Sequence, residues 1–193
     1  MSLTGMIMPA PLLVDAGRGT GKPSPMDEAR FEAFYRRTAG GLWSYLFRMT
    51  GDAAASDDLL QKTFFRFLRA NPVVASDEHM RRWVFRTATN LALDHFRETK
   101  RRRERETPEA PVLPSGSTDS RDLRHDMMKT FSELKPRERA LLWLAHVEEA
   151  DHEHISEALG VKTKSVKVLL FRARKRLGEL LTTKGLAPAR GAR

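Results

Sequence analysis

Seven Lys or Arg residues and no acidic residue lie between Lys162 and Arg176, the stretch of the chain best suited to binding a polyanion. Apolar residues in this stretch recur at steps of four, three and four, which predicts a helix that begins at Thr163 or Lys164 and has one apolar face. These apolar positions are Val166, Leu170, Ala173 and Leu177.

A shorter amphipathic segment, Asp151 to Leu159, precedes the basic helix and ends at Gly160, where a left-handed residue lets the chain turn sharply. Two helices joined in this way, the second one basic, predict a helix-turn-helix whose second helix enters the DNA major groove. A solvated cationic face would give the same pattern, but like charges one turn apart repel, which favours an anionic partner. Val168, Leu169 and Phe171 fall outside the apolar stripe and would contact either bases or a protein.

Two further groups of residues suggest other chemistry but lack the spacing for it. His152 and His154 would point about 200° apart on a helix, whereas metal ligands on a helix need positions one turn apart. The stretch Gly17 to Ser24 lacks the glycine spacing of a phosphate-binding loop, and Pro23 stands where Ser or Thr should follow the lysine. We therefore expect no metal site and no cofactor.

Composition limits the remaining functions. A net charge of +9 and a pI near 10.2 indicate nucleic acid or another anionic surface as the partner. The chain has no Cys, which excludes disulfides and thiolate metal sites. No apolar run approaches the roughly 20 residues of a membrane span, and the start lacks a secretory signal pattern. We expect a soluble, cytoplasmic protein without membrane insertion.

Helical periodicity predicts an all-α chain of two small domains. The first half should hold helices from Asp27 to near Gly51, from about Ala54 to before Pro72, and from His79 or Met80 to about Arg103. Pro136 suits the first position of a later helix. The expected organisation is a flexible arm (1–25), a helix bundle (26–104), a flexible linker rich in Pro, Ser and Thr (105–122), a helix-turn-helix domain (123–182) and a flexible tail (183–193).

Three stretches, in this order, resemble the sigma-70 family, specifically the small two-domain extracytoplasmic-function (ECF) sigma factors that direct bacterial RNA polymerase to promoters. They are SDDLLQKTFFRFL at 56–68, RRWVFRTATNLALDHFR at 81–97, and the segment from Leu134 to Leu177 that contains the helix-turn-helix. Many regulators share a helix-turn-helix, so a single match would be weak evidence. Three matches in family order are specific.

The resemblance implies three binding surfaces. The first stretch would dock on the clamp coiled coil of core RNA polymerase through Asp57, Asp58, Leu59, Gln61 and Phe64, although core packing is the alternative for Leu59 and Phe64. The second would contact the −10 element of promoter DNA through Arg86, Asn90, Arg97, Lys100, Arg101 and Arg102, with Trp83 in the core. The third would read the −35 element through Lys162, Lys164, Ser165, Lys167, Val168, Phe171 and Arg172.

The implied protein is a sigma factor that has no catalytic activity of its own, binds core RNA polymerase and promoter DNA, and is held inactive by an anti-sigma factor. Lys62 stands where the family usually has an acid. The aliphatic Val168 and Leu169 replace polar residues, so promoter recognition should depend more on phosphate contacts and DNA shape. Two alternatives remain: a helix-turn-helix regulator that is not a sigma factor, and an enzyme that uses a metal or a nucleotide.

Overall fold

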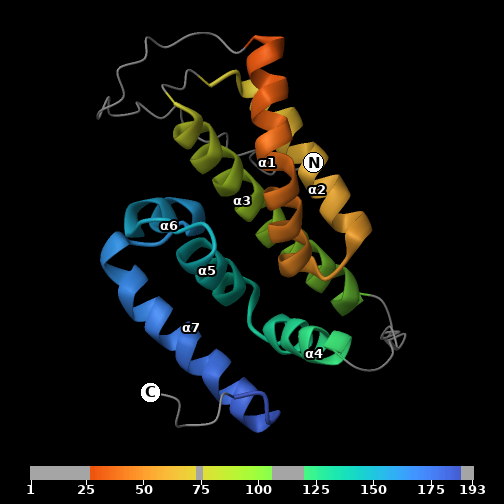
Figure 1. Cartoon of the computed structure of the whole chain (residues 1–193), viewed down its shortest axis with the longest axis vertical. Helices are drawn as coiled ribbons and strands as arrows, with labels where there is room; N and C mark the ends of the chain where they lie inside the picture. Colours follow the sequence, from red (N-terminus) through yellow and green to blue (C-terminus); the bar gives the residue numbers. More distant parts are fainter. Residues whose placement is uncertain (1–26, 73–75, 106–119, 188–193) are drawn as a thin grey trace.

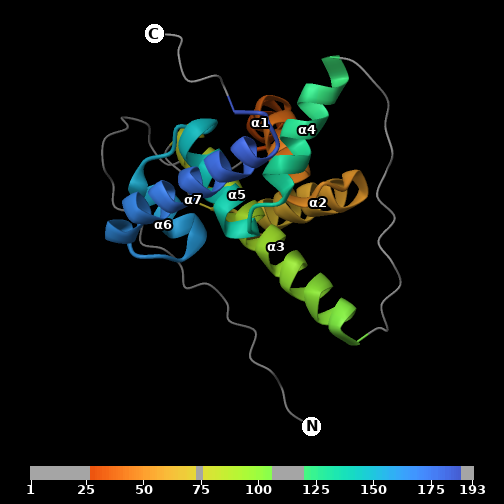
Figure 2. The same cartoon turned by 90° about the horizontal axis from the view of Figure 1, so that it is seen from below.

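Seven α-helices make up the part of the chain that the computed structural model describes, residues 27–72, 76–105 and 120–187 (Figures 1 and 2). They are α1 (Glu28–Thr50), α2 (Ala53–Ala70), α3 (Asp77–Arg105), α4 (Ser120–Ser132), α5 (Pro136–His146), α6 (His152–Leu159) and α7 (Thr163–Thr183). No strand occurs within these ranges, and the all-α prediction is confirmed. The predicted arm, most of the linker and the end of the tail lie outside the described residues.

Local side-chain chemistry sets the helix ends. Asp27, Asp52 and Asp151 each accept a hydrogen bond from a backbone N–H in the first turn of the following helix, at 2.7, 2.9 and 2.7 Å. Helices α1 and α6 end at Gly51 and Gly160, which have φ angles of 73° and 62°. Glycine adopts such left-handed angles without the steric cost of a Cβ atom, and the predicted turn at Gly160 is confirmed.

The N-terminal unit consists of α1, α2 and α3 packed side by side. Its core is aromatic, with Phe34, Phe67 and Phe85 buried to 1% exposure or less. Trp83 is half-buried, and its ring lies 5.3 Å from the ring of Phe67, as expected for a core position. The helices that carry the first two family-like stretches therefore form one packed bundle.

The C-terminal unit contains α4 to α7. Ile155 of α6 and Val166 of α7 are fully buried, and the hydroxyls of Ser156 and Thr163 lie 3.0 Å apart across the Gly160 turn. These contacts fix the angle between the two helices of the helix-turn-helix. The basic face of α7 is thereby directed away from its own core.

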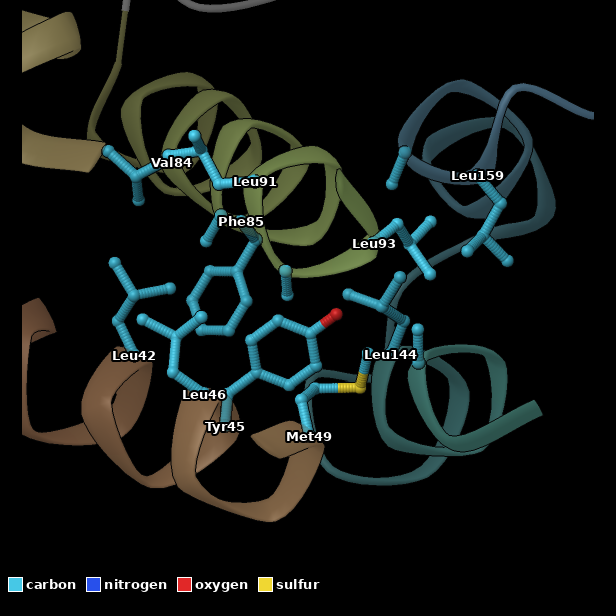
Figure 3. Close-up of a cluster of buried hydrophobic side chains, with 14 of the residues drawn as sticks. Leu42, Tyr45, Leu46, Met49, Val84, Phe85, Leu91, Leu93, Leu144 and Leu159 are labelled. Carbon is cyan, nitrogen blue, oxygen red and sulfur yellow. The ribbon is translucent and has the colours of Figure 1, made fainter. Parts of the chain in front are cut away.

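The two units pack directly against each other, so that α1 and α3 face α5 and α6 (Figure 1). Figure 3 shows Tyr45 and Met49 of α1, Leu93 of α3 and Leu144 of α5 gathered in one apolar cluster. The Tyr45 ring, which is fully buried, lies 5.9 Å from the ring of Trp143. The cores of the two units are therefore continuous in this structure.

Candidate nucleic-acid interface

The outer face of α7 presents most of the residues predicted to read DNA. Lys164, Lys167, Val168, Phe171 and Arg172 are exposed and spaced three or four residues apart, so they share one side of the helix. Lys162, just before the helix, is exposed as well, and Ser165 is half-buried. Val166, Leu170 and Ala173 hold the opposite side against the core.

Leu169 differs from the prediction. It is half-buried and packs against the core, so its placement outside the apolar stripe is wrong. Val168 and Phe171 remain exposed, at 50% and 65%. The apolar part of the outer face of α7 therefore consists of two side chains, flanked by cations.

The C-terminal half of α3 carries the second predicted DNA surface. It extends beyond the other helices in Figure 2. Asn90 is exposed, and so are the cations Arg97, Lys100, Arg101 and Arg102. Arg97 pairs with Asp94 at 2.5 Å and Lys100 with Glu104 at 3.6 Å, but these partners lie on the same helix and stay exposed. Such pairs are weak and easily exchanged for phosphate contacts.

Arg86 lies apart from these residues. It is half-buried, and its guanidinium is 3.5 Å from the carboxylate of Glu157 on α6. It therefore faces the C-terminal unit, whereas the other predicted −10 residues face solvent. The sequence did not reveal this contact, because 71 positions separate the two residues.

The residues of α2 that were predicted to contact the polymerase fall into two groups, one exposed and one buried. Asp57, Asp58 and Gln61 are exposed, but Leu59 and Phe64 are only 3% and 4% exposed. Burial makes these two core residues, and their predicted role as contacts is corrected accordingly. Asp57 accepts a 2.7 Å hydrogen bond from the Trp43 indole, and Asp58 pairs with Lys62 at 2.6 Å.

Two residues that sequence reasoning missed complete this face. Phe65 and Leu68 are 66% and 49% exposed, and they follow Asp58 and Gln61 around the same side of α2. The signal was present in the sequence: Phe65 falls half a turn away from the stripe formed by the buried Leu59, Thr63 and Phe67. Outward aromatic residues of this kind are typical of protein interfaces.

The two histidines of α6 lie in different surroundings. His152 is exposed and His154 is buried, and the described residues contain no group of His, Asp or Glu arranged to hold an ion. Because it lies on an early turn of a helix, His154 was expected at the surface, but α3 covers it. Burial, with the Arg82 guanidinium nearby, lowers the pKa of His154 below its ordinary value.

This pKa shift predicts a pH dependence of stability. Above about pH 6.5 the imidazole is neutral in both the folded and unfolded chains, and no penalty exists. Below that value the unfolded chain binds a proton that the folded chain resists, so the free energy of unfolding should fall as the pH falls. Asp151 and Glu157 also lie near the ring, and their negative charges reduce the penalty without removing it.

Thermal unfolding at about pH 7.5 and about pH 5.5, on either side of the ordinary histidine pKa, measures this effect. The fall in Tm between the two should be smaller in His154→Gln than in the unmodified chain. His152→Gln, an exposed histidine on the same helix, should leave the fall unchanged. An equal fall in all three proteins would contradict the role of His154.

Comparison with known proteins places both units in one family. Residues 34–102 match the model for sigma-70 region 2, and residues 124–177 match the model for sigma-70 region 4. The two matches together cover more than half of the chain. No helix within the described ranges is long and apolar enough to cross a bilayer.

The named relatives of the chain are sigma factors. The chain is 28% identical to the ECF RNA polymerase sigma factor SigG of Mycobacterium tuberculosis, over 79% of this chain and 50% of SigG. It is 27% identical to the RNA polymerase sigma factor CarQ of Myxococcus xanthus, over 83% of this chain and 94% of CarQ. The chain thus spans about half the length of SigG but nearly all of CarQ.

A solved structure shares the fold. The sigma factor RpoE from Bartonella quintana, solved in complex with the anti-sigma factor NepR, superimposes with a TM-score of 0.63 at 20% identity. The match covers 79% of this chain and 96% of RpoE. With region 2 and region 4 matched in order and ECF sigma factors as relatives, the chain belongs to the extracytoplasmic-function group of the sigma-70 family.

Proposed function

We propose that this chain is a sigma factor that binds core RNA polymerase and directs it to promoters by contacting −35 and −10 DNA elements. The observation that carries the proposal is the presence of two separate cationic surfaces, on α7 and on the end of α3, in units that match regions 4 and 2. In this proposal the chain supplies binding surfaces and leaves catalysis to the polymerase.

The α7 surface suits the −35 element. The exposed cations Lys162, Lys164, Lys167 and Arg172 can neutralise phosphates on both sides of a major groove entered by the helix. Val168 and Phe171, between them, can make apolar contact with thymine methyl groups. Specificity then rests on a few apolar contacts and on DNA shape, with lysine supplying less directional hydrogen bonds than arginine.

The α3 surface suits the −10 element. Asn90 offers an amide that can pair with an adenine edge, and Arg97, Lys100, Arg101 and Arg102 follow it toward the end of the helix. In this proposal Asn90 reads a base and the cations that follow it bind phosphates.

The exposed face of α2 suits the polymerase. Asp57, Asp58 and Gln61 form an acidic and polar edge next to the apolar Phe65 and Leu68. A helix with these two properties can lie along a basic, partly apolar partner helix. In the free chain Lys62 forms an ion pair with Asp58 at 2.6 Å. The Lys62 side chain must move away when a cationic partner approaches Asp58.

An anti-sigma factor completes the proposal as a further partner, because the structurally similar RpoE was solved in complex with one. Between α4, α5 and α7 lies an apolar groove of about 390 Å³, lined by Phe131, Leu142, Trp143, Leu177 and Leu181 among others. Such a groove can receive the apolar face of an amphipathic helix.

Transcription with purified components tests the function directly. Core polymerase plus this chain should give RNA that starts at one defined position on a responsive promoter, whereas core polymerase alone should not. A helix-turn-helix regulator would give such RNA only when a different sigma factor is also present. That second outcome would overturn the proposal.

Lys167→Ala tests the assignment of α7 to the −35 element. Loss of one phosphate contact should weaken binding of the holoenzyme to the −35 element and reduce the slope of log affinity against log salt by about 1. Protection of −35 DNA in a footprint should fall more than opening at −10. Arg176→Ala, on the opposite side of α7, is the control and should change neither. Equal losses at both elements in Lys167→Ala would contradict the assignment.

A further inference from the structure

Two exposed apolar side chains stand among the cations on the outer face of α7. Val168 is 50% exposed and Phe171 is 65% exposed, and within the described ranges neither packs against the core. Val166 and Leu170 lie on the opposite side of the same helix and are buried. The packing of the chain therefore does not account for Val168 and Phe171, and their position on the helix points to a ligand.

The charges around these two side chains favour DNA as that ligand. Lys164, Lys167 and Arg172 are exposed on the same side of α7, and no acidic residue occurs between Lys162 and Arg176. In duplex DNA, phosphates border the major groove on both sides, and the edges of the bases form its floor. An apolar centre flanked by cations is complementary to that arrangement.

The two side chains occupy the part of a recognition helix that reaches base edges. Helix α7 begins at Thr163, so Val168 and Phe171 follow five and eight positions later, in the N-terminal half of the helix. Recognition helices contact bases with their N-terminal residues. Three residues advance about 4.5 Å along a helix, and one base step is about 3.4 Å. The two side chains can therefore contact the same base pair or two neighbouring ones.

The major groove offers one apolar group to such side chains, the methyl group on C5 of a pyrimidine. Thymine carries this methyl group, and a methylated cytosine presents it in the same place. Valine and phenylalanine side chains neither donate nor accept hydrogen bonds, so the methyl group is what they can distinguish. In a helix the branched Val168 side chain is held almost entirely in one rotamer, so its own methyl groups stay in position for the contact.

We propose that Val168 and Phe171 make recognition of the −35 element depend on C5-methyl groups. At the base pairs that these side chains contact, thymine or 5-methylcytosine is preferred over uracil or unmethylated cytosine. This inference rests on the proposed function, which assigns the outer face of α7 to the −35 element. It follows that methylation of a contacted cytosine strengthens a promoter for this chain without any change in base pairing.

A methyl scan of the −35 element tests the proposal with the holoenzyme. Each thymine on either strand is replaced in turn by uracil, which removes only the methyl group, and each cytosine by 5-methylcytosine, which adds it. At one base pair or two neighbouring ones, affinity should fall about fourfold with uracil or rise about fourfold with 5-methylcytosine, the effect of burying one carbon atom. The same affinity at every step of the scan would overturn the proposal.

Variants of α7 identify the side chains that read the methyl group. In Phe171→Ala the ratio of affinities with and without the methyl group should fall from about four to about one at one contacted position. Val168→Ala should do the same at that base pair or its neighbour. Lys167→Ala is the control: it should weaken binding to both duplexes equally and keep the ratio, because a phosphate contact does not read the base. An unchanged ratio in both Phe171→Ala and Val168→Ala would overturn the assignment.

The remaining outcomes separate this inference from the proposed function. If Val168 and Phe171 contact a protein instead, Phe171→Ala should weaken binding of the chain to core polymerase, and the thymine and uracil duplexes should bind alike, which would overturn the inference. Promoter-specific RNA with an affinity that ignores the methyl groups would overturn the inference alone. Absence of promoter-specific RNA from the unmodified promoter would overturn the proposed function and this inference with it.

Discussion

Phe65→Asp should reduce the affinity of the chain for core RNA polymerase by about thirty-fold or more while leaving its helical content unchanged. Phe65 is 66% exposed on the acidic edge of α2, next to Asp58 and Gln61. An exposed aromatic residue at the centre of a contact commonly contributes about 2 kcal/mol or more to binding. An added carboxylate must also be desolvated against the partner. Competition for fluorescently labelled core enzyme measures the loss.

Two further variants separate loss of the Phe65 contact from a general effect of added negative charge. Ala33→Asp adds the same charge at an exposed position of α1 and should bind polymerase normally. Phe65→Leu keeps an apolar contact and should show a smaller loss. Normal binding by Phe65→Asp would show that α2 does not dock on the polymerase, whatever experiments on the DNA-binding surfaces show.

Phe67→Ala should destabilise the N-terminal unit by about 3–5 kcal/mol, the range for truncating a buried aromatic side chain. Phe67 has no exposed surface, and its ring lies 5.5 Å from Phe34 and 5.3 Å from Trp83. Because α1, α2 and α3 meet at this ring, the cavity affects all three helices. Urea denaturation followed by circular dichroism measures the change in the free energy of unfolding.

Leu68→Ala is the matched control on the same helix. Leu68 is 49% exposed, and its truncation should cost less than about 1 kcal/mol. Similar losses in Leu68→Ala and Phe67→Ala would contradict the placement of α2 in the bundle. A loss of polymerase binding confined to Leu68→Ala would extend the docking face beyond Phe65.

Helix existence and helix ends were predictable, because they depend on residues close together in the chain. The apolar spacing of Val166, Leu170 and Ala173 specified the inner side of α7, and Gly160 specified the turn before it. Pro136 was correctly placed at the start of α5. The exposed cations on α7 followed from the same periodicity, since a residue opposite the apolar stripe has no core to enter.

Burial on α2 and α6 was less predictable, because it depends on which neighbour covers a helix. Leu59 and Phe64 are core residues since α1 and α3 pack on that side, which leaves Phe65 outside. His154 lies on an early turn of its helix, but α3 of the other unit covers it. Local residue spacing does not show which helix, far away along the chain, will cover a given residue.

The amino-acid sequence by itself determined the all-α fold, the helix boundaries, the cationic faces of α3 and α7, and the likeness to a sigma factor, because each depends on local spacing or on residue type. Only the tertiary structure decided that Arg139 caps α1 and that Arg81, Arg82 and Arg86 pair with acids of the other unit. Ion pairs between distant segments are set by how the packed surfaces meet. That geometry arises from the apolar contacts of Tyr45, Met49 and Leu144. Contacts between residues so far apart in the sequence produce no repeating pattern from which they could be predicted.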